Sequence, residues 1–311
     1  MTKARPALEA LTAATLARWP EHASYLAKSR EGRSEAVLDV SEKVAEIVLK
    51  LAAADPGGVD KAVDDYRFLC EEIVLPEELF FRRNGHYRLS TFAEANAEVY
   101  ENGPFMDRYM NGLLFSNVIW HNHSHAMTYY VTQYLPRLPM GADTLEIGPG
   151  HGIFMYFAAI APNVGSVTGW DLSPASIAKT RHALATLGIT RPVKLIQQDM
   201  FDVGTPADAD MVDSIVMSEI LEHVEDPVAA MRSAARSLRP GGYLWVNVPA
   251  NSPSPDHIFL VNSPEHANQL VRDAGLEVVD SAAYVMGGAS LEKAAKQLLS
   301  VSCVVTAQKP R

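Results

Sequence analysis

Three glycines beside an acidic residue are the part of this sequence best suited to chemistry. Gly148, Gly150 and Gly152 follow the apolar run TLEI, and a helical pattern begins directly after them. Because glycine has no Cβ, such a loop lets the backbone approach a ligand, and the N-terminus of the following helix offers unpaired N–H groups. The pattern therefore predicts a ligand cradle within residues 144–154.

The charge beside this loop indicates the kind of ligand. The spacing is Glu146-x-Gly148-x-Gly150-x-Gly152, which differs from the G-x-G-x-x-G spacing of dinucleotide-binding folds. A carboxylate at position 146 would repel a pyrophosphate, whereas it suits a ligand that carries an ammonium or sulfonium group. We therefore expect a cationic cofactor.

Two further strand ends carry carboxylates next to apolar side chains. Asp171 and Leu172 end the second predicted strand, about 20 residues beyond the first glycine, where an acid can accept hydrogen bonds from both hydroxyls of a ribose. Asp199 and Met200 follow the third predicted strand and offer an acceptor for an exocyclic amine beside an apolar surface for an adenine ring. These residues are candidate ligands of a nucleoside.

The fourth predicted strand ends in Ser218 and Glu219. Taken one at a time, such residues are most often turn or cap residues, because that is their commonest use. Taken together, they follow successive strands, and the carboxyl ends of parallel strands face one ligand crevice in an open α/β sheet. We therefore expect the four strand ends to converge on one site.

The elements that position these residues change in character near residue 140. Up to Leu135 the apolar residues recur at helical spacing, with residues 80–90 read as a loop or small ribbon around Asn84-Gly85. Beyond Gly141, helices predicted near Ile153, Ser173, Glu225 and Pro264 alternate with short apolar strands, which are TLEI, SVTGW, VKLIQ, DSIVM and YLWVNV, followed by LEVVDSAAYV and SVSCVVTAQ. We expect an α/β fold, with residues 1–140 as a helical N-terminal lid or substrate region and 141–311 as the cofactor-binding domain.

Together these motifs resemble those of the class I S-adenosylmethionine-dependent methyltransferases. The matching segments are EIGPGHG, WDLS, QQDMF and MSEILEHVEDP, followed by LRPGGYLWVNVP. The resemblance covers roughly residues 143–309 and implies a Rossmann-like, seven-stranded, mostly parallel sheet with one antiparallel strand near its end. It also implies ligand roles, with the amino-acid part of the cofactor near Glu146, Gly148 and Gly150, the ribose on Asp171 and the adenine near Asp199 and Met200.

Two histidines are candidates for handling the methyl acceptor. His223 lies beyond the fourth predicted strand and His257 beyond the fifth, so both belong to the ligand edge of the sheet, where either could act as a general base. Each could equally be a loop residue bonded to its own backbone. The two together could bind a metal that chelates an acceptor such as an α-keto acid, but two ligands without a fixed spacing are a weak pattern, and we assign no metal ligand.

The segment before the first strand is expected to roof the pocket. A helix over residues 118–135 that runs antiparallel to that strand would bring Trp120, His121 and His125 to the cofactor edge. The two histidines share a helix face, yet no obvious third ligand accompanies them, so contact with substrate or solvent is preferred over a metal pair. The preceding FMDRYMNGLLFSN resembles the covering helices of small-molecule methyltransferases and supplies Tyr109 as a further substrate residue.

Composition limits the partners. The chain has 311 residues and a formal net charge of −10, which suits a nucleic-acid partner poorly. Cys70 and Cys303 lie far apart in apolar surroundings, as expected for free thiols, and the sequence predicts neither a secretory leader nor a membrane span, so we expect a cytoplasmic protein. The N-terminal helices could also pair two copies in a homodimer.

The sequence thus predicts an S-adenosylmethionine-dependent methyltransferase that acts on an O, N or C atom of a small molecule, as in secondary metabolism. Three alternatives stay open at this point. The first is metal-assisted C-methylation of an α-keto acid. The second is a nicotinamide-dependent oxidoreductase, which the loop spacing and Glu146 oppose. The third is a non-catalytic subunit that keeps the cofactor fold.

Overall fold

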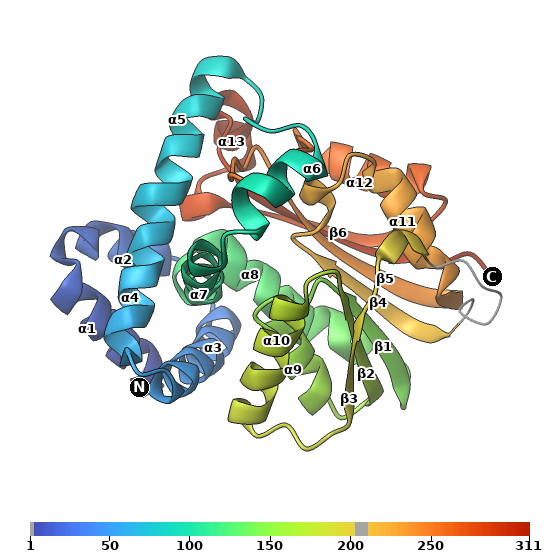
Figure 1. The fold of residues 1–311 in the computed structure, drawn as a ribbon, viewed down its shortest axis with the longest axis horizontal. Helices are drawn as coiled ribbons and strands as arrows, with labels where there is room; N and C mark the ends of the chain where they lie inside the picture. The colour runs from blue at the N-terminus through green and yellow to red at the C-terminus, as the bar shows by residue number, and fades with distance from the viewer. Residues whose placement is uncertain (1–2, 203–210) are drawn as a thin grey trace.

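A mixed sheet lies at the centre of the protein. The computed structural model describes residues 3–202 and 211–311, and in this part of the chain seven strands follow the order β3-β2-β1-β4-β5-β7-β6 (Figure 1). All neighbours are parallel except β7, which is antiparallel to both β5 and β6. The expected Rossmann-like sheet with one antiparallel strand is confirmed. The strands are β1 Ala142–Ile147, β2 Val164–Asp171, β3 Val193–Gln197, β4 Val212–Ser218, β5 Leu238–Ala250, β6 Glu277–Val285 and β7 Val301–Gln308.

The crossover helices begin where short polar side chains precede a proline. Ser173, Asp226 and Ser263 each accept a hydrogen bond from a backbone N–H in the first turn of the helix that follows, and a proline takes the first helical position after each. Such caps satisfy N–H groups that have no partner within the helix. The helices of this half are α9 Ile153–Ile160, α10 Pro174–Leu187, α11 Pro227–Arg236, α12 Pro264–Asp273 and α13 Leu291–Gln297.

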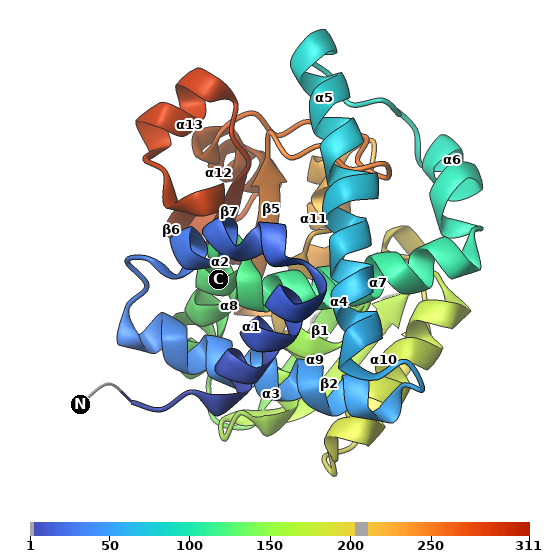
Figure 2. The same cartoon turned by 90° about the vertical axis from the view of Figure 1, so that its left-hand side faces the viewer.

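The N-terminal half is helical and lies beside the sheet, blue to green in Figures 1 and 2. One correction concerns residues 80–90, where α5 continues to Asn84 and ends at Gly85, whose φ of 75° makes it a helix C-cap rather than a hairpin turn. The elements are α1 Pro6–Arg18, α2 Ala23–Arg30, α3 Glu35–Ala54, α4 Gly58–Phe68, α5 Leu75–Asn84, α6 Phe92–Ala95, α7 Gly103–Ile119 and α8 His121–Tyr129, with π-helical turns η2 Leu69–Val74, η3 Asn96–Tyr100 and η4 Tyr130–Tyr134.

The two halves share one hydrophobic core. Leu11 and Tyr66 from the N-terminal helices belong to the same buried cluster as Tyr130, Phe154 and Trp245 from the region of the sheet. Tyr130 packs with its ring centroid 5.1 Å from that of Phe154 and 5.0 Å from that of Trp245. The helices are therefore fixed against the sheet by packing. Among the described helices, none combines the length and the hydrophobicity that a membrane span requires.

A break separates α7 from α8, where the sequence predicted one helix over residues 118–135. Trp120 has φ −73° and ψ 133°, which is extended backbone. The last carbonyls of α7 are satisfied from outside the helix, because the buried Arg33 guanidinium donates to Val118 O at 2.9 Å and to Ile119 O at 2.8 Å, and Ser29 also donates to Ile119. This capping from α2 and its following loop ends the helix and lets the chain turn at Trp120.

Candidate active site

A cavity of about 1170 Å³ lies at the carboxyl ends of β1 to β4 and is covered by the N-terminal helices. Its wall contains residues of the glycine loop, of the three following strand ends and of α7, for example Gly148, Asp171, Asp199 and Met110. This volume is at the upper end of ordinary small-molecule sites. Residues at the carboxyl ends of all four strands line this one cavity, as the sequence predicted.

The glycine loop leaves bare backbone beside a buried acid. Gly148 and Gly150 have φ values of 66° and 51°, and a Cβ on Gly150 would lie 2.7 Å from Met110 Cε. Glu146 is 5% exposed, and its Oε2 has no hydrogen-bond partner in the described structure. Burial, and then the charge of Asp171, raises the pKa of Glu146 well above its usual range. A cationic ligand group at this point would relieve that cost, so the site fits the cofactor expected from the sequence.

Asp171 and Asp199 keep their local roles and still face the cavity. Asp171 accepts hydrogen bonds from Ser173 N at 2.9 Å and from the Ser176 hydroxyl. Asp199 accepts one from Phe201 N at 2.8 Å. Both residues line the cavity, as do the predicted Leu172 and Met200. A turn role and a ligand role are therefore compatible here.

Gly152 differs from the other two glycines of the loop because it does not line the cavity. It precedes α9 with φ 77°, and a Cβ there would approach Thr180 Cγ2 to 3.2 Å. Its position is explained by helix initiation and by packing against α10. The expected direct contact of Gly152 with the cofactor is therefore not supported.

The end of β4 is strained. Glu219 has φ 54°, a left-handed conformation that is uncommon for a residue with a side chain. Asn247 on β5 donates to Glu219 Oε1 at 2.8 Å and to Ser218 Oγ at 3.3 Å. Burial raises the pKa of Glu219 to about 8. The left-handed backbone and the hydrogen bonds from Asn247 orient the Glu219 side chain, which lines the cavity together with Ser218.

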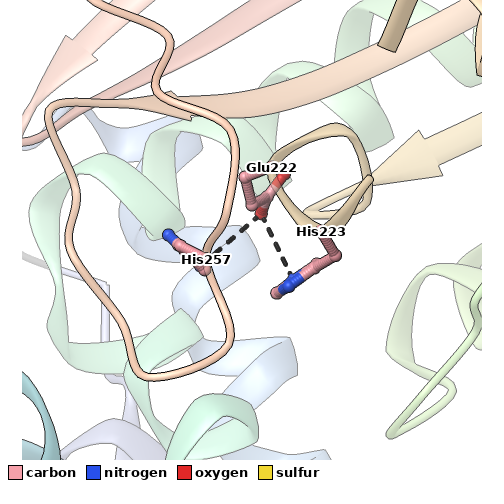
Figure 3. Close-up of side chains that lie close together, drawn as sticks. All are labelled: Glu222, His223 and His257. Carbon is pink, nitrogen blue, oxygen red and sulfur yellow. Dashed lines mark ion pairs between the residues drawn. The ribbon is translucent and has the colours of Figure 1, made fainter. Parts of the chain in front are cut away.

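His223 and His257 lie side by side at the far end of the cavity. Their ring centroids are 4.9 Å apart, and both residues line the wall. His223 Nδ1 lies 3.0 Å from Asp256 O, and His257 Nδ1 lies 2.6 Å from Ser252 O. Their Nε2 atoms lie 3.7 and 3.9 Å from Oε1 of the buried Glu222, which stands between them (Figure 3). Burial lowers the pKa of His257 to about 4, so that ring stays neutral near pH 7.

A second buried carboxylate, Asp256, is fully partnered. Tyr100 and Tyr109 donate to its two oxygens at 3.2 and 3.0 Å, and the Tyr109 hydroxyl also lies 2.7 Å from Ser254 Oγ. Burial opposes ionisation of Asp256, yet the charges of His223 and His257 and these hydrogen bonds outweigh it and lower its pKa. The covering helices are thus bonded directly to the loop that carries His257.

The predicted roof is only partly correct. Tyr109 and Trp120 line the cavity, but His121 and His125 do not. Their rings stack on each other with centroids 3.9 Å apart, and His125 lies against Tyr284 of β6 at 5.3 Å. The break at residue 120 sets the rotation of α8, so that His123 rather than its two neighbours reaches the wall.

Sequence reasoning missed Glu222, Asp256, Tyr100 and His123. Glu222 and Asp256 precede the two selected histidines directly, in LEHVEDP and PSPDHIF, so the repeated acid-histidine pair was an available signal. Tyr100 and His123 lay in helical segments where aromatic residues usually form core, and no pattern distinguished them.

The order of the strands and the position of the site define the class: a Rossmann-like methyltransferase with a helical cover. The chain belongs to the family described as "Methyltransferase domain", whose model matches residues 119–298, more than half of the chain. The expectation of a class I S-adenosylmethionine-dependent methyltransferase is thereby confirmed, and the oxidoreductase alternative is set aside.

The individual relatives and solved structures share less than a third of their aligned residues with this chain. The ubiquinone biosynthesis O-methyltransferase of Pseudomonas paraeruginosa is 29% identical over 160 residues, which are 45% of this chain and 66% of that protein. The protein of the same name from Xylella fastidiosa is 32% identical over 142 residues, or 43% of this chain and 55% of the relative. Among solved structures, the [4+2]-cyclase SpnF aligns with a TM-score of 0.47 and 20% identity, over 59% of this chain and 81% of that one.

Proposed function

We propose that this protein transfers a methyl group from S-adenosylmethionine to a small molecule bound in the same cavity. When bound, S-adenosylmethionine supplies a methyl carbon whose bond to the sulfonium sulfur breaks, with the electron pair going to sulfur, as the acceptor atom forms its new bond. The observation that carries this proposal is one cavity with two chemically different ends. Glu146 and the glycine loop lie at one end, and the histidine pair lies at the other.

The residues of the first end are suited to hold the cofactor. The unpartnered Glu146 carboxyl would accept from its ammonium group, and the bare backbone of Gly148 and Gly150 would receive its amino-acid part. Asp171 would accept from the ribose hydroxyls and Asp199 from the adenine amine.

The second end favours an acceptor that must lose a proton. His223 is 18% exposed at the wall, and the carboxyls of Glu222 and Asp256 lie 3.7 and 3.6 Å from its ring nitrogens. An acceptor hydroxyl held there would become more nucleophilic as its proton is drawn away. The O-methyltransferase names of the relatives support an oxygen acceptor. The cover of helices excludes water and large acceptors, and the net charge of −10 speaks against nucleic acid.

Calorimetric titration with S-adenosylmethionine and S-adenosylhomocysteine tests the cofactor end. Asp171→Ala should weaken both ligands about 10- to 100-fold, because hydrogen bonds to a charged group are lost. Asp143→Asn is the matched control, since that residue lies near the start of the neighbouring strand β1, at the opposite edge of the sheet, where it pairs with Arg239. Its affinity should equal that of the wild type. Absence of heat with either ligand in the wild type would refute the proposal.

A further inference from the structure

Three atoms that can only accept converge at the acceptor end of the cavity. Ligand atoms of Glu222, His223 and His257 all lie within 4.8 Å of one another. Figure 3 shows the Glu222 carboxyl between the two imidazole rings, with the short helical turn η8 (Leu221–His223) and the loop after β5 supplying the three residues. Glu222 is fully buried, and neither of its carboxyl oxygens has a hydrogen-bond partner of good geometry in the described structure.

The backbone fixes the form of both histidines. His257 Nδ1 faces the carbonyl oxygen of Ser252, which can only accept, so this atom carries the hydrogen and Nε2 presents a lone pair toward Glu222. His223 Nδ1 lies 3.0 Å from Asp256 O and 3.2 Å from the Tyr100 hydroxyl. Because Tyr100 donates its hydrogen to Asp256, His223 Nδ1 is the donor to both oxygens, and Nε2 of His223 faces Glu222. The distances of 3.7 and 3.9 Å between these Nε2 atoms and Glu222 Oε1 are too long for hydrogen bonds. A backbone carbonyl on Nδ1 is also the arrangement that orients metal-binding histidines in proteins.

Glu222 contrasts with its neighbour Asp256. Asp256 is equally buried but receives hydrogen bonds from two tyrosine hydroxyls. No donor of good geometry reaches either carboxyl oxygen of Glu222 in the described structure, and the side chain that interacts with it is a second acid, Glu219. A buried carboxylate without a partner is costly, and this cost would be offset by a cation between the three groups.

We propose that Glu222 and the Nε2 atoms of His223 and His257 bind a divalent transition-metal ion such as iron(II), cobalt(II) or zinc. Two histidines and one carboxylate are a common ligand set for such ions, and they leave coordination positions open to substrate. Ligand atoms about 2.0–2.2 Å from an ion lie roughly 3–3.5 Å apart. The 3.7 and 3.9 Å separations from Glu222 would need to shorten by only a few tenths of an ångström. The ligand atoms of all three residues lie within 4.8 Å of one another, so the remaining pair would need to close by up to about 1.5 Å.

The ion would also define the acceptor class, and this part of the inference rests on the proposed function. His223 and His257 line the cavity that the acceptor enters, and the fully buried Glu222 lies 3.7 and 3.9 Å from their Nε2 atoms. A metal at that position favours an acceptor that coordinates through a deprotonated oxygen, as a hydroxyl or an enolate does, because coordination lowers the pKa of the bound group. Because His223 Nε2 would be a ligand in this arrangement, the coordinated group would release its proton to solvent before its oxygen or the adjacent carbon receives the methyl group.

Metal binding can be tested without turnover. The full chain is stripped with a chelator, desalted under anaerobic conditions and titrated with Co²⁺, with visible absorption and the metal content after gel filtration as readouts. The wild type should retain about one ion per chain with ligand-field bands. Glu222→Gln and His257→Asn should each weaken binding more than about 100-fold, since loss of an outer partner alone costs 10- to 100-fold. His182→Asn, at an exposed position on α10, should bind as the wild type does.

Thermal unfolding distinguishes loss of a ligand from loss of the fold. Glu222→Gln replaces a buried carboxyl by an amide of the same size that cannot supply a carboxylate ligand, so the metal-free variant should melt near or above the temperature of the metal-free wild type and should gain nothing from Co²⁺. Equal Co²⁺ binding by wild type and Glu222→Gln, or no retention by the wild type, overturns the inference. Calorimetry with S-adenosylhomocysteine on the same samples separates the two proposals, because cofactor binding without metal retention refutes only this one.

Discussion

At the scale of single residues, the glycine loop needs both a left-handed backbone conformation and the absence of side chains beside the ligand. Gly148 and Gly85 have similar φ values, 66° and 75°, so a side chain strains both backbones alike. A Cβ on Gly85 would meet nothing within 4 Å, whereas one on Gly148 would overlap the Ile220 side chain at the cavity wall. Alanine substitutions at Gly148 and Gly85 therefore distinguish the free-energy cost of backbone strain from the effect of a methyl group that occupies space beside the cavity.

Gly148→Ala and Gly85→Ala should each lower the free energy of unfolding by about 1–2 kcal/mol, the cost of a left-handed conformation for a residue with a Cβ. Only Gly148→Ala should weaken S-adenosylhomocysteine, by about 10-fold, because the displaced loop loses a contact with the ligand. Urea denaturation and calorimetry measure the two effects. Unchanged affinity in Gly148→Ala would mean that this loop does not contact the cofactor.

At the scale of elements, the end of α7 depends on a side chain distant in sequence. Arg33 is 8% exposed and supplies the hydrogen bonds that the last carbonyls of α7 require. This termination turns the chain at Trp120 and sets which face of α8 meets the cavity. By ending α7, the Arg33 guanidinium therefore helps to determine which side chains of α8 line the cavity.

Arg33→Met should lower the free energy of unfolding by at least about 2 kcal/mol, because buried carbonyls lose their donors. Arg33→Lys should recover only part of this loss, since an ammonium cannot reproduce the planar fork. Arg67→Met is the control, because Arg67 makes an exposed pair with Glu71 and should change stability little. Equal denaturation midpoints for Arg33→Met and Arg67→Met would contradict this account of the junction.

The sequence predicted elements well where local signals were strong. The strand VKLIQ has the predicted bounds, and α9, α10 and α12 begin within one residue of their predicted starts, because glycine, serine-proline and strand periodicity act locally. The break at Trp120 could not be predicted, since its cause is Arg33, which lies far away in the chain. The same break explains why Trp120 was placed correctly whereas His121 and His125 were not.

In the candidate site, too, the features that local sequence signals determine could be predicted, and those that depend on contacts distant in the chain could not. The gathering of Glu146, Asp171, Asp199 and Glu219 around one cavity could be predicted, because the edge of a parallel sheet brings strand ends together in a fixed way. The partners of His223 and His257 could not, because they come from a loop conformation and from helices packed across the cavity.

At the scale of the whole molecule, buried groups of both signs make stability depend on pH. Burial lowers the pKa of six of the described histidines. The pKa falls to about 4 for His22, His121, His123 and His257 and to about 3 for His151, and it is also lowered for His125. The unfolded chain binds their protons near pH 6.5, so stability is lost as pH falls from 6.5 toward 4. Burial raises the pKa of Glu219 to about 8 and those of Glu146 and Glu222 well above normal, so stability is lost as pH rises from 4.5 through 8.

The free energy of unfolding of the ligand-free, metal-free protein should therefore peak between about pH 6 and 7 and fall on both sides. Denaturant titrations at pH 5, 6.5 and 8 would measure it. Glu219→Gln should reduce the loss on the alkaline side, and His123→Gln should reduce it on the acidic side, while His182→Asn, at an exposed position, serves as the control. A continuous rise in stability up to pH 9 would show that the glutamates are not held in their protonated form.

The helical cover meets the reactive end of the cavity through two phenols, Tyr100 and Tyr109. Both donate to Asp256, and the Tyr100 hydroxyl also lies 3.2 Å from His223 Nδ1. Most of the other cavity-lining side chains of α7 are apolar, such as Met106, Met110 and Leu113, and the polar ones are Asp107 and Asn117. Substitutions of these α7 side chains could therefore change the shape of the acceptor compartment while both phenols are kept. New substrates could then be accepted without any change to the reaction centre.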